Sequence, residues 1–152
     1  MTKNEYDINI VKVVDGDTVD VDIDLGFNIQ LKDERVRIIG IYTPKSRTAD
    51  SIEKLYGLAA KERVYELLKD GGKLVTTENK KGEDMRGKFG RILGDFRTND
   101  GRMLTEILIE EGHCVPYFGG SKDDIKEMHL LNRQKLLNEG IVSRDEYDAL
   151  IP

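Results

Sequence analysis

The sequence has few residues that bind metals through sulfur or nitrogen: one cysteine, Cys114, and two histidines, His113 and His129. A single cysteine excludes an intramolecular disulfide, and these three residues cannot by themselves build a cysteine-type zinc site. Neighbours on a strand point to opposite faces, so His113 and Cys114 do not predict a reactive pair. We interpret Cys114 as a buried part of the core.

Long apolar runs are also missing. No segment approaches the roughly 20 apolar residues that a membrane-spanning helix needs. Residues 1–7, MTKNEYD, contain no apolar stretch of the kind that a signal peptide carries. We therefore expect a cytoplasmic protein with no membrane partner.

An excess of positive charge is absent as well. The chain has 24 Lys and Arg against 29 Asp and Glu, a formal net charge of -5. Such a field does not favour a polyanion, so any nucleic acid would bind a local basic patch. Two patches are visible. One is formed by Lys80, Lys81, Arg86, Lys88 and Arg91, and the other by Arg35, Arg37, Lys45 and Arg47.

What remains is a chain of 152 residues with 38% hydrophobic and 35% charged residues. These values are typical of one globular domain with a solvated surface, large enough to bury a core. We expect a monomer in which residues 1–140 form a single domain and residues 141–152 a C-terminal tail.

The hydrophobic pattern changes period along the chain. Val19, Val21 and Ile23 alternate with acidic residues, which predicts a strand with one apolar face. The same test predicts strands near 6–13, 19–24, 27–31, 35–41, 74–77 and 91–97, with a hairpin turn at Leu25-Gly26. Helical spacing predicts helices at about 50–70, 104–111 and 123–138. This order predicts an α+β, β-rich fold: a five-stranded OB-type barrel with three helices.

Four motifs occur in a fixed order: VDGDTV at 14–19, RIIGIYTP at 37–44, EKLYG at 53–57 and KFGR at 88–91. Asp-Gly alone is a common turn dipeptide and carries little information. The ordered set closely resembles the staphylococcal nuclease (thermonuclease) family, from about Val11 to about Tyr117. The resemblance implies an OB-type barrel and a calcium-dependent phosphodiesterase that acts on DNA and RNA.

The resemblance also implies roles for single residues. Asp17 matches the first calcium carboxylate, and Thr43 matches a residue whose backbone carbonyl binds the ion. Arg37 and Arg91 match two arginines that hold the scissile phosphate and stabilise its transition state. Guanidinium groups suit that task because they bind phosphate oxygens bidentately. The alternative is that Arg37 is simply an exposed arginine on a strand and Arg91 a cation at the end of a loop.

Two positions depart from the family pattern. Tyr42 stands where a second calcium carboxylate is expected, and Lys45 stands where a glutamate is proposed to activate water. A protonated phenol is a poor ligand for a hard cation, and an ammonium repels one. We therefore expect calcium binding to be weak or absent, and the chain to be inactive or strongly weakened as a nuclease.

Other acidic residues could replace the missing carboxylates of the site. Asp50 and Glu53 follow the Thr43-Pro44 segment and could turn toward the site, whereas residues 20, 22 and 24 point away if their strand is regular. Two accounts of the departures stay open. In one account, single-base changes produced Tyr42 and Lys45, either by drift or by deliberate disabling of a nuclease. In the other account, Lys45 helps to form a phosphate-binding pocket that needs no cation.

The remaining candidates are weaker. Tyr117 lies where the family places tyrosines against a base, although core packing explains it equally well. Lys45, Arg47 and Lys88 could follow a nucleic-acid backbone or simply be solvated. The leading hypothesis is a disabled thermonuclease-like domain with DNA or RNA as its partner. The alternatives are a non-catalytic module that binds nucleic acid or protein in the same cleft, and a metal-dependent nuclease with other ligands.

Overall fold

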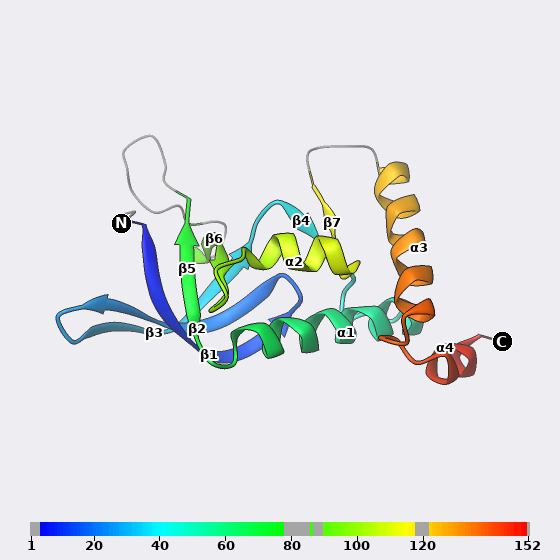
Figure 1. The fold of residues 1–152 in the computed structure, drawn as a ribbon, viewed down its shortest axis with the longest axis horizontal. Coiled ribbons are helices and arrows are strands. Elements are labelled where there is room, and N and C mark those ends of the chain that lie inside the picture. The colour runs from blue at the N-terminus through cyan, green and yellow to red at the C-terminus, as the bar shows by residue number, and fades with distance from the viewer. Residues whose placement is uncertain (1–3, 78–85, 87–89, 118–121, 152) are drawn as a thin grey trace.

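A computed structural model describes residues 4–77, 86, 90–117 and 122–151. Its centre is a closed five-stranded barrel in the order β1-β2-β3-β6-β5, seen beside the helices in Figure 1. The strands are β1 (Glu5–Asp15), β2 (Thr18–Gly26), β3 (Ile29–Ile38), β5 (Gly72–Thr76) and β6 (Ile92–Arg97). The predicted barrel is confirmed.

The long first strand closes the barrel. Ile8 of β1 pairs with Ile23 of β2 on one side and with Gly72 of β5 on the other. Neighbouring strands are antiparallel except β3 and β6, which pair in parallel. A two-stranded sheet of β4 (Ile41–Tyr42) and β7 (Val115–Pro116) lies outside the barrel.

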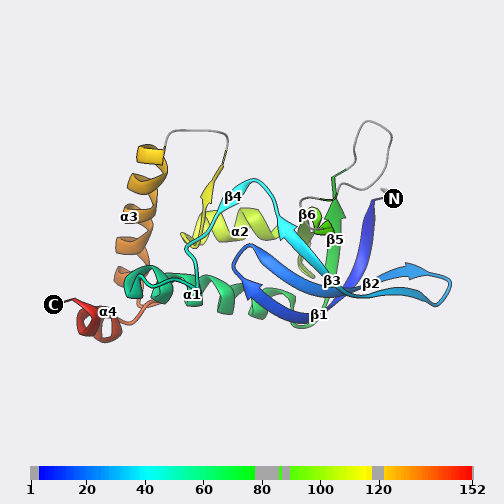
Figure 2. The ribbon, with the colours of Figure 1, turned by 180° about the vertical axis from the view of Figure 1, so that it is seen from behind.

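The hairpin of β2 and β3 differs from the prediction. Its turn is Phe27-Asn28 rather than Leu25-Gly26, and both turn residues have positive φ, 54° and 64°. Such a two-residue turn matches the twist of the flanking strands, which lets β2 run through Gly26. The two strands predicted for 27–31 and 35–41 are one strand, β3, and the chain leaves the barrel at Gly40 (φ 82°). The hairpin extends away from the barrel in Figure 2.

The helices are α1 (Ser51–Leu68), α2 (Leu104–Glu111), α3 (Lys122–Asn138) and α4 (Arg144–Leu150). The predicted number of three is therefore wrong for the part of the chain described. The tail expected at 141–152 contains α4, whose N-cap Ser143 accepts a hydrogen bond from the Glu146 backbone N–H at 3.3 Å. A short capped helix with few apolar residues leaves a weak periodic signal, so it escaped detection.

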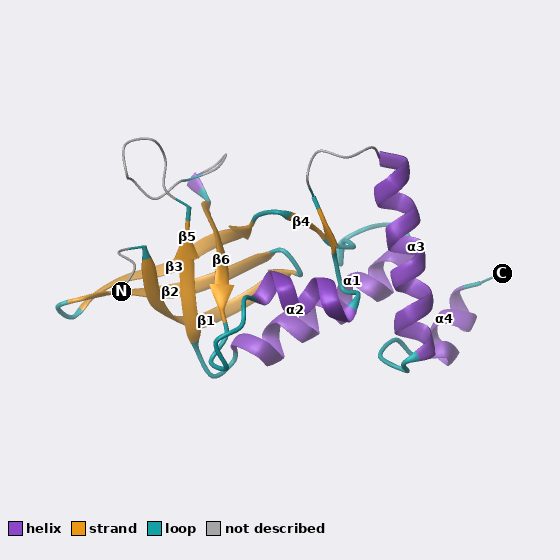
Figure 3. Ribbon diagram, turned by 45° about the horizontal axis from the view of Figure 1, so that its top comes forward, coloured by secondary structure: helices purple, strands orange, loops and turns teal. Residues whose placement is uncertain are grey.

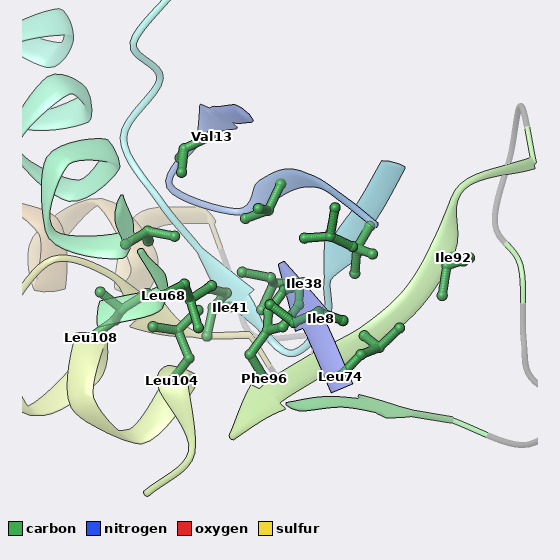
Figure 4. Packing of buried hydrophobic residues seen from close by; sticks show 14 of the residues in the cluster. Ile8, Val13, Ile38, Ile41, Leu68, Leu74, Ile92, Phe96, Leu104 and Leu108 are labelled. Atoms are coloured by element: carbon green, nitrogen blue, oxygen red, sulfur yellow. The ribbon is translucent and has the colours of Figure 1, made fainter. Parts of the chain in front are cut away.

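Two apolar clusters hold these elements together. The larger fills the barrel and the space under α1 and α2; Ile38, Phe96 and Leu104 are among its buried members (Figure 4). The smaller cluster joins α1 to α3 and α4, which lie beyond the barrel in Figure 3. At its centre the Tyr56 hydroxyl donates to the Arg133 carbonyl at 3.0 Å.

Among the described residues, no helix is both long and apolar enough to cross a membrane.

Candidate functional site

A polar cleft of about 850 Å³ opens where the β1–β2 turn meets β3 and the start of β6. Five of the residues singled out in the sequence line it: Asp17, Arg35, Arg37, Lys45 and Arg91. The turn residue Asp17 is tied to the barrel because its carbonyl accepts a hydrogen bond from the Ile38 backbone N–H at 2.8 Å. The fold thus brings together side chains that lie far apart in the sequence.

Asp17 is the buried anion of this cleft, with 2% of its surface exposed. Its Oδ1 accepts a hydrogen bond from the Thr18 hydroxyl at 3.0 Å. Its Oδ2 forms ion pairs with two cations: Arg37 Nη1, and Lys45 Nζ at 3.5 Å. Both carboxylate oxygens therefore already have partners supplied by the chain.

The backbone of Lys45 is held from three sides. Its N–H donates to Glu53 Oε1 at 3.3 Å, and the next N–H, that of Ser46, donates to Asp15 Oδ1 at 3.2 Å. The segment also lies directly on α1 at Gly57, where an added Cβ would be 2.3 Å from the Lys45 carbonyl oxygen. These contacts place the Lys45 side chain next to Asp17.

Tyr42 is engaged with Tyr117 across the small sheet. The two ring centroids are 4.4 Å apart in an edge-on arrangement. A side-chain hydrogen bond with Tyr117, with a smaller contribution from desolvation, raises the pKa of Tyr42. The phenol therefore stays protonated at neutral pH and offers no anionic ligand. Tyr117 itself is 44% exposed.

The remaining predicted residues lie in different surroundings. Arg91 is half-buried in the cleft wall. Thr43 is buried, with 4% of its surface exposed. Arg47 is exposed and is not among the residues that line the cleft, and Lys88 lies outside the described residues.

The acidic residues that could replace the missing carboxylates have other partners. Asp50 caps α1, where its Oδ1 accepts from the backbone N–H groups of Ile52 and Glu53 at 3.1 Å. Glu53 accepts from Lys45, as described above. Asp20 is not among the residues that line the cleft, and it forms a bidentate pair with Arg35, which does line it, at 2.8 and 3.1 Å. Within the described ranges, no group of three or more His, Cys, Asp or Glu side chains is arranged to hold a metal ion.

The donor set therefore does not fit calcium. Calcium takes six to eight oxygen ligands and depends on anionic ones. Among the described carboxylates that line the cleft, the buried one, Asp17, is neutralised by an arginine and a lysine, and the tyrosine at 42 is neutral.

Sequence reasoning missed two features of this site. The carboxylate of Asp15 accepts hydrogen bonds from the backbone N–H groups of both Gly16 and Ser46, and the VDGDTV motif does not indicate this second contact. The Tyr42–Tyr117 contact was also missed, because it depends on the pairing of β4 with β7, in which Tyr42 lies opposite Val115.

The closed barrel, with Asp17, Arg37 and Arg91 in one cleft, is the arrangement that the sequence resemblance implies. The model of the family described as staphylococcal nuclease homologue matches residues 35–139, and the chain belongs to that family. It is 36% identical over 110 residues to the SPbeta prophage-derived endonuclease YokF of Bacillus subtilis (strain 168), covering 72% of this chain and 34% of that protein. It is 34% identical over 110 residues to Endonuclease YncB of the same organism, covering 72% of this chain and 47% of that protein. The chain thus spans less than half the length of either relative.

Proposed function

We propose that this chain binds DNA or RNA through its cleft and that its calcium-dependent phosphodiester hydrolysis is lost or strongly weakened. Family membership and two relatives named as endonucleases support nucleic acid as the ligand. Arg37 and Arg91, both in the cleft wall, supply guanidinium groups for a phosphate. The observation that carries the loss of hydrolysis is the pairing of Asp17 Oδ2 with both Arg37 and Lys45.

The chemistry of hydrolysis lacks two of its usual parts here. Water must be activated as it attacks phosphorus, and a protonated lysine cannot accept the proton that a glutamate would take. Loss of a general base alone typically costs about 10² to 10⁴ in rate. Charge on the phosphate must also be stabilised, which two arginines can do only in part without a divalent ion.

The runner-up is a purely non-catalytic module that holds nucleic acid or a protein in the same cleft. The Tyr42–Tyr117 contact favours the nucleic-acid form, because an exposed aromatic ring beside a phosphate site suits base stacking. A third candidate, a nuclease that uses other metal ligands, predicts saturable calcium binding. Calorimetric titration tests it: we expect no saturable heat, and tight binding would favour this third candidate.

Activity is tested by DNA degradation with calcium, comparing the chain with a Tyr42→Asp, Lys45→Glu double variant. We expect cleavage by the double variant and little or none by the parent. The triple variant that adds Arg91→Ala serves as the control, and should lose the restored activity. Equal rates for the parent and the double variant would contradict the disabled site, and a folded but inactive double variant would contradict the assigned mechanism.

A further inference from the structure

Arg37 faces an internal competitor for any phosphate. Its guanidinium is paired with the Asp17 carboxylate, and Nη1 also lies 3.4 Å from the Asp17 carbonyl oxygen. A phosphate that takes Arg37 bidentately must draw it away from that carboxylate. Since the Asp17 side chain is only 3% exposed, leaving it unpaired would be costly.

Lys45 removes much of that cost. Its ammonium lies 3.5 Å from the same oxygen, Asp17 Oδ2, that Arg37 contacts. The Lys45 side chain is 51% exposed and keeps freedom to move closer, while its backbone is held by Glu53 and Gly57. Asp17 thus has a second counter-ion in place before any ligand arrives.

The overall charge of the cleft makes this exchange necessary. Among the described residues, the cleft lining contains as many carboxylates as cationic side chains, four of each: Asp15, Asp17, Asp33 and Glu34 against Arg35, Arg37, Lys45 and Arg91. Within this described lining, no excess of positive charge attracts a phosphate. Affinity therefore depends on cations that can leave their carboxylates and bind the ligand.

We propose that Lys45 takes over the place of a divalent cation at Asp17: it keeps the carboxylate paired while Arg37 transfers to a phosphate group, so that the cleft binds nucleic-acid phosphate without metal. This inference rests on the proposed function. In this proposal the Asp17 carboxylate, which matches a calcium ligand of the family, competes with the phosphate for Arg37 and so weakens phosphate binding. Lys45 is a positioning residue that acts through Arg37.

The test is fluorescence anisotropy of a labelled single-stranded oligonucleotide at low salt with EDTA present. Asp17→Asn should tighten binding about fivefold or more, because Arg37 loses its charged competitor. Lys45→Met should weaken binding by a similar factor. In the Asp17→Asn background, Lys45→Met should have a much smaller effect, because no carboxylate remains to be paired.

The exposed ion pair of Asp7 and Lys73, with an N···O distance of 3.0 Å, provides matched controls. It lies at the start of β1 and β5, and neither residue lines the cleft. Asp7→Asn and Lys73→Met change the net charge by the same amounts and should alter affinity less than twofold.

The outcomes separate the two proposals. If the parent binds and Asp17→Asn binds no more tightly than Asp7→Asn does, the role of Lys45 is overturned while the proposed function stands. If neither the parent nor Asp17→Asn binds, nucleic-acid binding itself is overturned. Calcium that tightens binding of the parent would also contradict the inference.

Discussion

Gly57 of α1 and Lys45 are in direct backbone contact: a Cβ on Gly57 would lie 2.3 Å from the Lys45 carbonyl oxygen and 2.6 Å from the Ser46 nitrogen. A glycine in the middle of a helix normally weakens it by about 1 kcal/mol relative to alanine. The position is occupied by glycine because the 43–46 segment passes over the helix there. The helix and the cleft are therefore fitted to each other at this point.

Gly57→Ala should destabilise the fold, against the usual sign for this substitution in a helix. The backbone at Lys45 must move, which we expect to cost about 1–3 kcal/mol. Urea denaturation measures it. Lys54→Ala, at an exposed position of the same helix, is the control and should change stability little. An increase in stability for Gly57→Ala would contradict the close contact.

The protein should lose stability as pH falls below neutrality. Burial lowers the pKa of His113, which is 3% exposed, and burial also lowers the pKa of His129. The two histidines therefore bind protons more readily in the unfolded chain than in the folded one. Their contribution to the free energy of unfolding is fully present above the unfolded pKa of roughly 6.5 and is lost as the pH falls below it. Urea denaturation between pH 7.5 and 5.5 measures the loss.

The variant His113→Gln tests that assignment. It removes one of the two titrating groups, so the pH dependence should shrink even if overall stability also changes. A slope equal to that of the parent chain would show that His113 does not contribute.

Asp95 of β6 should be important for α2. Its Oδ2 accepts a hydrogen bond from the Thr105 hydroxyl at 2.5 Å, and its Oδ1 lies 3.4 Å from the Thr105 backbone nitrogen. The N-cap residue of α2, Met103, makes no side-chain cap of its own. Asp95→Ala should therefore cost about 1–3 kcal/mol of stability, measured by urea denaturation.

The reciprocal variant Thr105→Val checks the same interaction from the helix side. It should destabilise the protein by a comparable amount and add little to Asp95→Ala in the double variant. Full additivity would contradict a shared contact.

Deletion of residues 141–152 should destabilise the protein, although the sequence predicts only a tail there. Val142 is 2% exposed, and Tyr147 packs edge-on against Tyr56 with ring centroids 6.4 Å apart. Burial of one such aliphatic side chain is worth about 1.5–3 kcal/mol. Deleting residues 151–152 alone is the control and should have little effect. Equal stabilities of the two truncations, compared by thermal unfolding, would contradict this packing.

The fold was largely predictable because alternation and helical period report burial directly. Val19 and Val21 are fully buried, as their spacing predicts. The turn at Phe27 was not predictable from the sequence, because a bulky residue with positive φ violates the usual turn preference. The twist of the two flanking strands favours this turn instead.

The candidate site was predictable in its parts but not in its connections. The order of motifs singled out Asp17, Arg37 and Arg91, and the departures from the family pattern at positions 42 and 45 could be read directly from the sequence. That Lys45 would lie on Asp17 depends on Asp15, Glu53 and Gly57 acting together, from three different segments. Such a convergence is a tertiary property that no local pattern contains.

The edge-on contact between Tyr42 and Tyr117 has a consequence for any substitution at position 42. A lone Tyr42→Asp change would remove a ring that Tyr117 packs against and put a charged group in its place. It would weaken the contact between β4 and β7. Stability of the small sheet and an acidic side chain at position 42 are therefore in conflict.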